Sequence, residues 1–332
     1  MERLNLTIRP RVSLALPVYN GEKFIGEAIS SILNQDYDNY ELIITDNAST
    51  DGTERICREF AARDERIRYV RNERNLGAGP NHNLGFKLSS GEYFKWCAAD
   101  DRISKDFLSP CVSILDKNSD VVLVYGTTQS IDEDGRSIPL VGDMMCEPQE
   151  CDGPARRFQK HLTDKGTNFE IFGVFRSDAL RKTTLQRPYY SSDRAVVSEI
   201  ALLGRLVYVP DIIFYNREHP DRSLNISDRR VRAAWQDTSL KSKYDLSHCK
   251  RAAHLIEIAI RHREVVPLSQ TLPFLLVWAL SSPQLARYAA NLIGVASPSA
   301  QQLLLRTGRQ LNHIYKSRKH NSRTQSAPLD RL

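Results

Sequence analysis

Two adjacent carboxylates, Asp100 and Asp101, follow an apolar segment of the chain, Glu92 to Cys97. Neighbouring carboxylates at the end of a buried strand repel each other, so a cation or hydrogen-bond donors must compensate them. A divalent ion such as Mg²⁺, bound by one or two carboxylates and by the phosphate oxygens of a substrate, is a common solution. Spacing alone leaves an equally good alternative, in which one of the acids caps the helix that begins near Lys105.

Two further polar clusters follow apolar segments. Asp46 and Asn47 come directly after Glu41 to Thr45, and Tyr19 follows Val12 to Val18. An acid and an amide could read a nucleobase or a ribose, although an Asx-turn before the next helix explains Asp46 and Asn47 nearly as well. In an open parallel sheet, ligands bind beyond the carboxyl ends of the strands. We therefore expect the three clusters to share one edge of a sheet.

Hydrophobic periodicity predicts the elements that would place these clusters. Strands are predicted at Val12 to Val18, Glu41 to Thr45, Arg66 to Arg71, Glu92 to Cys97 and Val121 to Tyr125. Helices are predicted from Ile25 to Leu33, after Asp51, from Pro80 to Leu88 and from Leu108 to Leu115. Glu54, three residues after Asp51, fits a capping box. Strands that alternate with helices across short loops predict right-handed βαβ units and a mostly parallel sheet.

The alternation weakens in the second half of the chain. The elements predicted there are strands at Asn168 to Leu180 and Leu206 to Tyr215, a helix near Ala195 to Leu203, and helices from about Trp235. Residues 265–305 hold a single charge, Arg287, but four prolines interrupt them. Because a transmembrane helix needs about 20 apolar residues, we expect a helical subdomain or a hairpin that lies in a membrane interface.

The composition is that of an ordinary globular protein, with 332 residues, 41% of them apolar and 26% charged. The net charge is +6, and residues 301–332 account for all of it. This distribution argues against a nucleic-acid partner and leaves two roles for the basic tail, a solvated end or attraction to anionic lipid headgroups. The six cysteines form no CxxC pair, so we expect neither a disulfide framework nor a zinc ribbon, and a reducing cytosol.

Four segments carry a resemblance to a known family. They are VSLALPVYNGEKFIGEAISSILNQDY, YELIITDNASTDGT, NLGAGPNHNLGF and GEYFKWCAADDRISKDFL, in this order. In order and spacing they resemble the nucleotide-binding half of a family 2 glycosyltransferase, and SSDRAVVSEIALLGRLVYVPDIIFYNREH resembles its acceptor-side segment. The resemblance implies the GT-A fold, a Rossmann-like α/β architecture whose mostly parallel sheet is flanked by helices, here with a C-terminal helical extension.

The resemblance also implies a role for the residues at the predicted sheet edge. Pro17 and Tyr19 would line the nucleobase pocket. Asp46 or Asn47 would contact the base, and Asp100 would meet the ribose. Many members have two acids where this chain has Asp46 and Asn47, which leaves the donor open between UDP-, dTDP- and GDP-sugars.

On the side of the leaving group, the resemblance implies that Asp101 binds Mg²⁺ or Mn²⁺, with His219 as an additional metal contact. The position two residues before Asp100 is often an acid and is Ala98 here, so the donor diphosphate would hold much of the ion. Asp193 in SSDRA matches the catalytic base of the family. One base on the acceptor side suggests in-line displacement with inversion.

These inferences predict a metal-dependent glycosyltransferase in which Asp46, Asp101 and Asp193 meet in one cleft. It would move a monosaccharide from a nucleotide-diphosphate sugar to a hydroxyl of a glycan or lipid-linked acceptor. The expected setting is bacterial-type surface polysaccharide synthesis, in the cytoplasm or at the inner face of the membrane. Aromatic residues would line the acceptor wall or belong to the core, namely Phe169, Phe172, Phe175, Tyr189 and Tyr190.

The predicted parts of the chain are an N-terminal arm at 1–11, a nucleotide-sugar-binding half at 12–128, an acceptor-binding half at 129–230 and a helical extension with a basic tail at 231–332.

Two other functions compete with the prediction of a glycosyltransferase. A sugar-phosphate nucleotidyltransferase should carry a Gly-rich, Arg-containing loop after the first strand, and the chain has PVYNGEK there. A non-catalytic nucleotide-sugar or glycan-binding module would not need Asp193 and the paired acids together.

Overall fold

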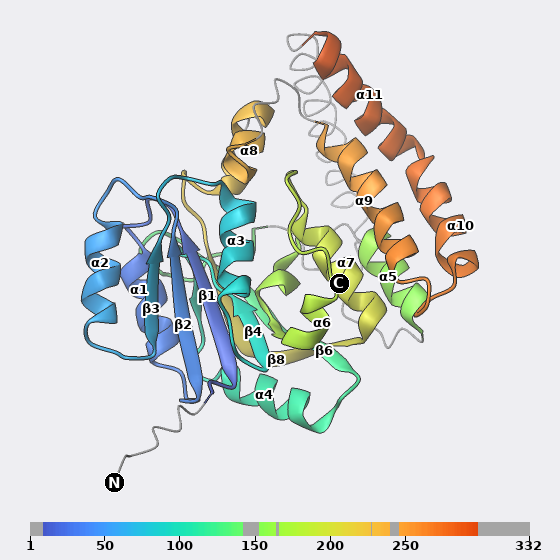
Figure 1. Cartoon of the computed structure of the whole chain (residues 1–332). Coiled ribbons are helices and arrows are strands. Elements are labelled where there is room, and N and C mark those ends of the chain that lie inside the picture. The colour runs from blue at the N-terminus through green and yellow to red at the C-terminus, as the bar shows by residue number, and fades with distance from the viewer. Residues whose placement is uncertain (1–8, 142–152, 164–165, 227, 240–245, 298–332) are drawn as a thin grey trace, which may run out of the picture.

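The computed structural model describes residues 9–141, 153–163, 166–226, 228–239 and 246–297 (Figure 1). The strands are β1 (Val12–Val18), β2 (Tyr40–Asp46), β3 (Ile67–Arg71), β4 (Tyr93–Trp96), β5 (Arg102–Ile103), β6 (Val121–Ile131), β7 (Val174–Arg176) and β8 (Arg205–Arg217). The helices are α1 (Ile25–Leu33), α2 (Thr53–Ala61), α3 (Ala78–Lys87), α4 (Leu108–Lys117), α5 (Pro154–Thr163), α6 (Ser177–Arg181), α7 (Asp193–Leu203), α8 (Arg229–Gln236), α9 (Ser247–Arg261), α10 (Leu268–Ala279) and α11 (Ser282–Ala296). Two 3₁₀ turns are η1 (Phe169–Phe172) and η2 (Ser223–Asn225).

The strands form one eight-stranded sheet in the order β3-β2-β1-β4-β7-β6-β8-β5. β3, β2, β1 and β4 are mutually parallel, as is the pair β6 and β8, whereas β7 and β5 run antiparallel to their neighbours. β1 is buried along its whole length: Leu14 and Leu16 face one core with α1 and α4, and Ala15 faces another with Phe86 of α3. Unbroken apolar strands of this kind are typical of a parallel sheet covered on both faces. The predicted α/β class is therefore correct.

The prediction of one strand over Asn168–Leu180 is wrong except at its centre. Only Val174–Arg176, which is β7, is extended; η1 precedes it and α6 follows. The 3₁₀ turn brings both Phe169 and Phe172 against Phe214 of β8, with ring centroids 6.2 and 4.6 Å apart. A strand would turn residues three positions apart to opposite faces. The aromatic spacing therefore belongs to a helical turn, and β7 is left as a short strand between β4 and β6.

Helix α2 begins close to its predicted start, but the predicted capping box is wrong. Asp51 accepts a hydrogen bond from the backbone amide of Thr53 at 3.0 Å, which forms an Asx-turn before the helix. Glu54 does not reach back to the helix start. Its carboxylate pairs instead with Arg58 at 2.9 Å and Arg71 at 3.3 Å, because two guanidinium groups compete for it.

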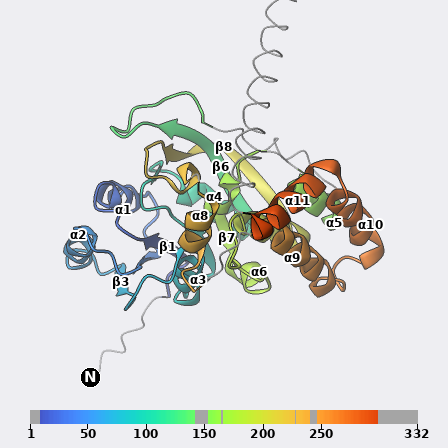
Figure 2. The same ribbon diagram turned by 90° about the horizontal axis from the view of Figure 1, so that it is seen from above.

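Three helices of the extension, α9, α10 and α11, lie on the side of the sheet away from α1 and α2 (Figures 1 and 2). Phe158 of α5, Ala195 of α7, and Leu255 and Ile258 of α9 are fully buried in a core of their own. No helix in the described part of the chain is long and apolar enough to cross a membrane. The basic tail at 301–332 lies outside the described residues.

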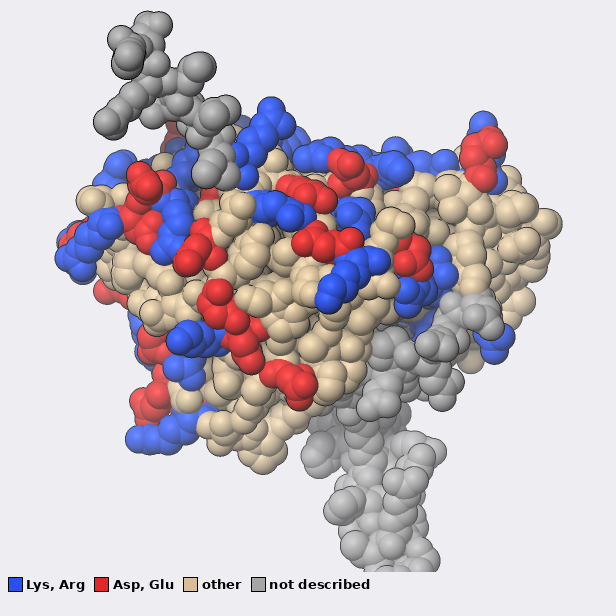
Figure 3. All heavy atoms as spheres, turned by 90° about the horizontal axis from the view of Figure 1, so that it is seen from below, with Lys and Arg blue, Asp and Glu red and all other residues tan. Residues whose placement is uncertain are grey.

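The distribution of charged side chains is consistent with the zero net charge of residues 1–300. Lys, Arg, Asp and Glu are interspersed over the face shown in Figure 3. The cysteines that the structure describes, Cys57, Cys97, Cys111 and Cys249, form no disulfide with one another.

Candidate active site

The predicted nucleobase residues lie at the carboxyl ends of β1 and β2, which run side by side with Val18 opposite Asp46. Asp46 is fully buried. Its Oδ1 accepts from the Ser49 amide at 2.8 Å, and its Oδ2 accepts from the Tyr69 hydroxyl at 2.5 Å and from Arg71 Nη1 at 3.0 Å. These donors compensate the buried charge.

Pro17 and Tyr19 stand at the end of β1, in different surroundings. Pro17 lies within the buried strand opposite Thr45. Tyr19 follows the strand and is 47% exposed. A half-exposed aromatic ring at a strand end is free to stack on a planar ligand.

Asn47 is buried, and its side chain is fully hydrogen-bonded within the protein. Its Oδ1 accepts from the Leu76 amide at 2.9 Å and from Asn72 Nδ2 at 3.2 Å. Its Nδ2 donates to Asn75 Oδ1 at 2.8 Å and to the Gly77 carbonyl at 3.2 Å. Because an amide side chain offers two donor hydrogens and two acceptor sites, Asn47 has no free site for a ligand. It ties the end of β2 to the loop before α3.

The glycines of that loop allow α8 to pack closely against it. A Cβ atom at Gly77, whose φ is +93°, would lie 2.5 Å from Cα of Asp237. One at Gly79 would lie 2.8 Å from Nε2 of Gln236. At Gly77 the contact is with backbone and φ is positive, so a side chain is excluded; at Gly79 a side chain would require the amide end of Gln236 to move. These glycines therefore serve the packing of two helices.

The adjacent carboxylates point in different directions. Asp101 is buried, and its Oδ1 accepts from the Arg217 amide at 2.7 Å. Burial, together with the neighbouring Asp100, raises the pKa of Asp101 well above its usual value. The side chain of Asp100 is 35% exposed, and its Oδ2 lies 3.0 Å from Nε2 of His219. The structure therefore brings His219 to Asp100, and Asp101 to β8.

Arg217, at the end of β8, holds this segment in place, and sequence reasoning missed it. Its fully buried side chain donates to the carbonyls of Asp100 at 2.8 Å, Glu133 at 2.8 Å and Asp132 at 3.3 Å, and pairs with Glu27 at 2.7 Å. The sequence did contain a signal for this role, because Arg217 follows an apolar run. An arginine in such a place is buried only when several hydrogen-bond acceptors surround it.

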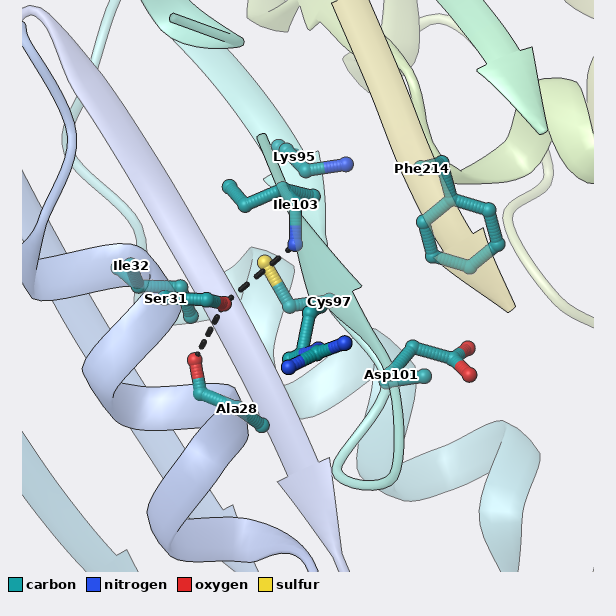
Figure 4. Close-up of a pocket in the computed structure, with 10 residues that line it drawn as sticks. Ala28, Ser31, Ile32, Lys95, Cys97, Asp101, Ile103 and Phe214 are labelled. Atoms are coloured by element: carbon teal, nitrogen blue, oxygen red, sulfur yellow. Dashed lines mark hydrogen bonds between the residues drawn. The ribbon is translucent and has the colours of Figure 1, made fainter. Parts of the chain in front are cut away.

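A small pocket lies beside Asp101 (Figure 4). Its empty volume is about 220 Å³, part of it open to solvent, and its apolar lining comes from α1, β5, β8 and the segment between β4 and β5. Burial lowers the pKa of Lys95, whose ammonium group donates to the Phe172 carbonyl and lies 4.3 Å from the centroid of Phe107. Pockets for drug-sized ligands usually exceed about 300 Å³. This pocket is therefore too small for a nucleotide sugar.

Asp193 is the first residue of α7, where the helix N-terminus favours a negative charge. Its Oδ2 accepts from Nδ2 of Asn168 at 3.0 Å. Ser191, two residues earlier, has a φ of +69°, a strained conformation for a residue with a side chain. Such strain is typical of functional loops.

The charge of Arg222 acts on the pKa of Tyr190, near Asp193, and on the pKa of Asp101. Burial raises the pKa of Tyr190, Asp193 raises it further, and Arg232 and Arg222 oppose this rise. Arg222 also opposes the rise in the pKa of Asp101. Arg222 therefore lies close enough to act on both sides of the candidate site.

Asp46, Asp101 and Asp193 are the three carboxylates expected to meet in one cleft. Each carboxylate belongs to its own hydrogen-bond network. Within the described residues, no three His, Cys, Asp or Glu side chains come together as a metal site. Of the predicted site residues, Asp100 and His219 are two potential ligands whose side chains lie within hydrogen-bond distance of each other.

Residues 13–183, just over half of the chain, match the family described as Glycosyl transferase family 2. The chain belongs to this family. An uncharacterized glycosyltransferase of Haemophilus influenzae is 29% identical over 231 residues, which cover 65% of this chain and 68% of that protein. Two further curated relatives match over only 22% and 21% of their own lengths.

Two solved structures share the fold of this family 2 glycosyltransferase. S. aureus TarS 1-349 in complex with UDP-GlcNAc has a TM-score of 0.54 and 20% identity, over 84% of this chain and 78% of that one. The mannosyltransferase PcManGT from Pyrobaculum calidifontis, in complex with GDP-Man and Mn²⁺, has a TM-score of 0.50 and 19% identity, over 87% of each chain. The predicted family and GT-A fold are confirmed.

Beyond residue 183, this family 2 glycosyltransferase contains a buried hydrogen-bond relay that sequence reasoning missed. The Tyr189 hydroxyl lies 2.7 Å from His254 Nδ1, and His254 Nε2 lies 2.7 Å from Thr184 Oγ1. The Thr184 hydroxyl donates to Glu199 Oε2 at 2.8 Å, and His262 Nε2 lies 2.8 Å from Glu199 Oε1. Because the Thr184 hydroxyl gives its hydrogen to Glu199, it accepts from His254 Nε2, and His254 Nδ1 then accepts from the Tyr189 hydroxyl. The relay joins α7 and α9 to the loop before Asp193.

Proposed function

We propose that this protein transfers a monosaccharide, with inversion, from a nucleotide-diphosphate sugar to a hydroxyl of a glycan or lipid-linked acceptor, and that it needs Mg²⁺ or Mn²⁺. The observation that carries the proposal is Asp193, a carboxylate at a helix N-terminus in a chain of this family. The bound molecules of the structural neighbours, UDP-GlcNAc and GDP-Man, support a nucleotide-sugar donor.

Asp193 would act as the general base. Asn168 holds Oδ2 at 3.0 Å, and Oδ1 makes no hydrogen bond within the described residues. Oδ1 would therefore take the proton of the acceptor hydroxyl as that oxygen attacks the anomeric carbon. A correctly placed base contributes roughly 10²–10⁴-fold to the rate. Attack from the side opposite the diphosphate inverts the configuration.

Asp100 and His219 would hold the metal ion. Oδ1 of Asp100 makes no hydrogen bond in the described part of the chain, and the pair offers oxygen and nitrogen ligands that suit Mn²⁺ or Mg²⁺. With Ala98 in place of a further acid, the diphosphate oxygens would supply the remaining ligands. When bound, the ion supplies Lewis-acid stabilisation of the diphosphate charge. Asp101, the metal ligand expected from the resemblance, would instead hold the backbone beside Asp100 through Arg217.

Pro17 and Tyr19 would line the nucleobase pocket, with Asp46 at its floor. Tyr19 is exposed enough to stack on a base, and Asp46 is held rigidly by Tyr69 and Arg71. Asn47, with its hydrogen-bonding capacity used, would shape the pocket through the loop before α3. UDP-, dTDP- and GDP-sugars are all candidate donors.

Of the aromatic residues expected at the acceptor wall, Tyr190 is the one we retain. Phe169 and Phe172 pack on Phe214, Phe175 is fully buried, and Tyr189 belongs to the relay. Tyr190 is partly buried and feels the charge of Asp193. Arg232 lies over one face of its ring, 4.4 Å from the centroid, so the ring would contact an acceptor sugar through its other face.

We propose that the enzyme works in the cytoplasm at the inner face of the membrane. Leu276, Val277 and Leu280, around the end of α10, are 56%, 73% and 66% exposed. Between residues 265 and 286 the chain carries no charge, and the basic tail follows α11. This combination suits contact with an anionic lipid surface, where a lipid-linked acceptor and surface polysaccharide synthesis would be found.

A donor panel tests the proposed function. The protein is incubated with UDP-, GDP- and dTDP-sugars, with and without EDTA, and release of nucleoside diphosphate is followed. We expect release from at least one donor and its loss with EDTA. Absence of release from every donor, together with absence of nucleotide binding, would contradict the proposal. Release that EDTA leaves unchanged would contradict metal dependence.

A further inference from the structure

Arg251, in the second turn of α9, is a largely buried guanidinium without an anionic partner. Among the described residues it makes no hydrogen bond and no ion pair, and its Nε is buried without any partner. The ring of Trp278 lies 5.7 Å from the guanidinium carbon. Burial lowers the pKa of Arg251 to about 10. Arg251 as a whole is partly exposed, but a guanidinium that is largely removed from water costs free energy unless a ligand or partner compensates it.

Two further polar groups without partners lie on α11. The Tyr288 hydroxyl is buried and unpaired, and Arg251 is among the groups that act on its pKa. Asn291 is fully buried; its Oδ1 accepts from the His248 amide at 3.1 Å, but its Nδ2 has no partner. Native proteins leave few such groups unsatisfied, so each needs an explanation. We call Arg251, Tyr288 and Asn291 the donor cluster.

The spacing of these residues places them on facing sides of two helices. His248 and Arg251 are one turn apart on α9, and Tyr288 and Asn291 are one turn apart on α11. His248 meets Asn291, and Arg251 lies near Tyr288, so the two pairs face each other in antiparallel order. The three unpaired donors therefore lie together at the interface of α9 and α11.

Helix α9, which carries Arg251, packs against α7, which begins at Asp193. Asp193 and Tyr189 both act to raise the pKa of Arg251, and Arg194 and Arg287 act to lower it. Arg251 thus faces the start of α7 in a region rich in arginine. The relay fixes this arrangement, since His254, three residues after Arg251, is bonded to Tyr189. All of these residues follow the segment 13–183 that the family shares.

A guanidinium fork, a hydroxyl and an amide NH₂ form the donor set that binds oxyanions. We propose that the donor cluster binds an oxyanion of the acceptor, a phosphate or a carboxylate, and so places the acceptor hydroxyl at Asp193. This inference rests on the proposed function, because it assigns the acceptor of that same reaction. Trp278 compensates part of the charge of Arg251, but it offers no acceptor for the N–H groups.

The first experiment measures anion binding with purified protein and two matched variants. Arg251→Gln removes the buried charge, and Arg263→Gln removes an exposed one just beyond the same helix, with a side chain that is 60% exposed. Sodium phosphate and sodium acetate are compared with sodium chloride of equal ionic strength in thermal unfolding. We expect phosphate or acetate to raise the Tm of the wild type and of Arg263→Gln, but not that of Arg251→Gln. Equal shifts in all three proteins would overturn the inference.

The Tm without added anion is a second readout. Removing an uncompensated buried charge should leave the Tm of Arg251→Gln equal to that of the wild type or higher. A marked fall would show that Arg251 has a structural partner and would overturn the inference. Arg251→Lys keeps the charge but loses the fork, so we expect only part of the anion-dependent shift to remain.

The second experiment identifies the anion and separates this inference from the proposed function. With a donor accepted in the panel, glucose 6-phosphate, glucuronate and glucose are compared as acceptors. We expect the wild type to prefer one of the two anionic sugars, and Arg251→Gln to lose that preference by about tenfold or more. If the wild type transfers sugar but Arg251→Gln keeps the same preference, the inference fails and the function stands. If the wild type neither binds nucleotides nor cleaves a donor, the proposed function fails. The anion-dependent shift in Tm then still shows whether the donor cluster binds an oxyanion.

Discussion

Replacement of Arg217 by methionine should destabilise the protein and weaken donor binding together. The guanidinium donates to three backbone carbonyls, at 2.8, 2.8 and 3.3 Å, and pairs with Glu27 at 2.7 Å. Glu27 is 48% exposed and regains water, so its ion pair adds little. The three carbonyls lose a charged donor, at about 1.5 kcal/mol each at the lower end, which suggests a loss of about 4.5 kcal/mol.

Thermal unfolding followed by circular dichroism measures this loss, and calorimetric titration with UDP measures donor binding. A loss of about 4.5 kcal/mol corresponds to a fall in Tm of about 10 °C for a protein of this size. We also expect UDP affinity to fall about tenfold, because Arg217 holds the backbone at Asp100. Arg205→Met is the matched control: Arg205 begins the same strand, is 48% exposed, and pairs with Asp120 on the surface. The reasoning is refuted if the two variants unfold at the same temperature.

Three shorter predictions follow. The raised pKa of Asp101 means that the free energy of unfolding falls as the pH rises from the usual aspartate value of 3.8 toward the raised one, because the unfolded state then releases its proton first. Asp101→Asn keeps an acceptor for the Arg217 amide but cannot ionise, so its Tm should exceed that of the wild type at pH 8 and match it at pH 4. Plots of Tm against pH that run parallel for the two proteins would contradict this. Tyr189→Phe should lower the ratio of sugar transfer to donor hydrolysis by about tenfold, whereas Tyr40→Phe, which loses a buried bond to the Ile32 carbonyl, should leave the ratio unchanged. Gly77→Ala should lower the free energy of unfolding by more than about 2 kcal/mol, because of backbone strain and the contact with Asp237. Gly153→Ala, at a similar φ in open space, should lose only the part that comes from strain. Equal losses in denaturant unfolding would show that α8 can move away.

Local patterns in the sequence predicted most of the sheet and its helices. The unbroken apolar run of β1 and the stripe of α1 both depend on neighbours within a few residues, and both elements have the predicted bounds. The strand predicted at Asn168–Leu180 failed because the apolar content of η1 was mistaken for an extended run. Its spacing of three between Phe169 and Phe172 already favoured a helical turn.

The contacts that organise the candidate site join residues far apart in the chain. Arg217 and Glu27 are 190 positions apart, and Tyr189 and His254 are 65 apart. No periodicity or motif links such pairs, so the relay and the donor cluster were invisible in the sequence. The sequence likewise placed Asn47 at the right strand end, but only the structure shows that its amide is fully used by the loop before α3.

The most direct measurement of the central claim is sugar transfer by Asp193→Asn with a donor that the wild type accepts. Asp178→Asn is the control, since Asp178 lies in α6 with a side chain that is 82% exposed. We predict that Asp193→Asn binds UDP or the accepted nucleotide as tightly as the wild type does but transfers sugar at least about 10²-fold more slowly, while Asp178→Asn is unchanged. Transfer by Asp193→Asn at the rate of Asp178→Asn would contradict the account.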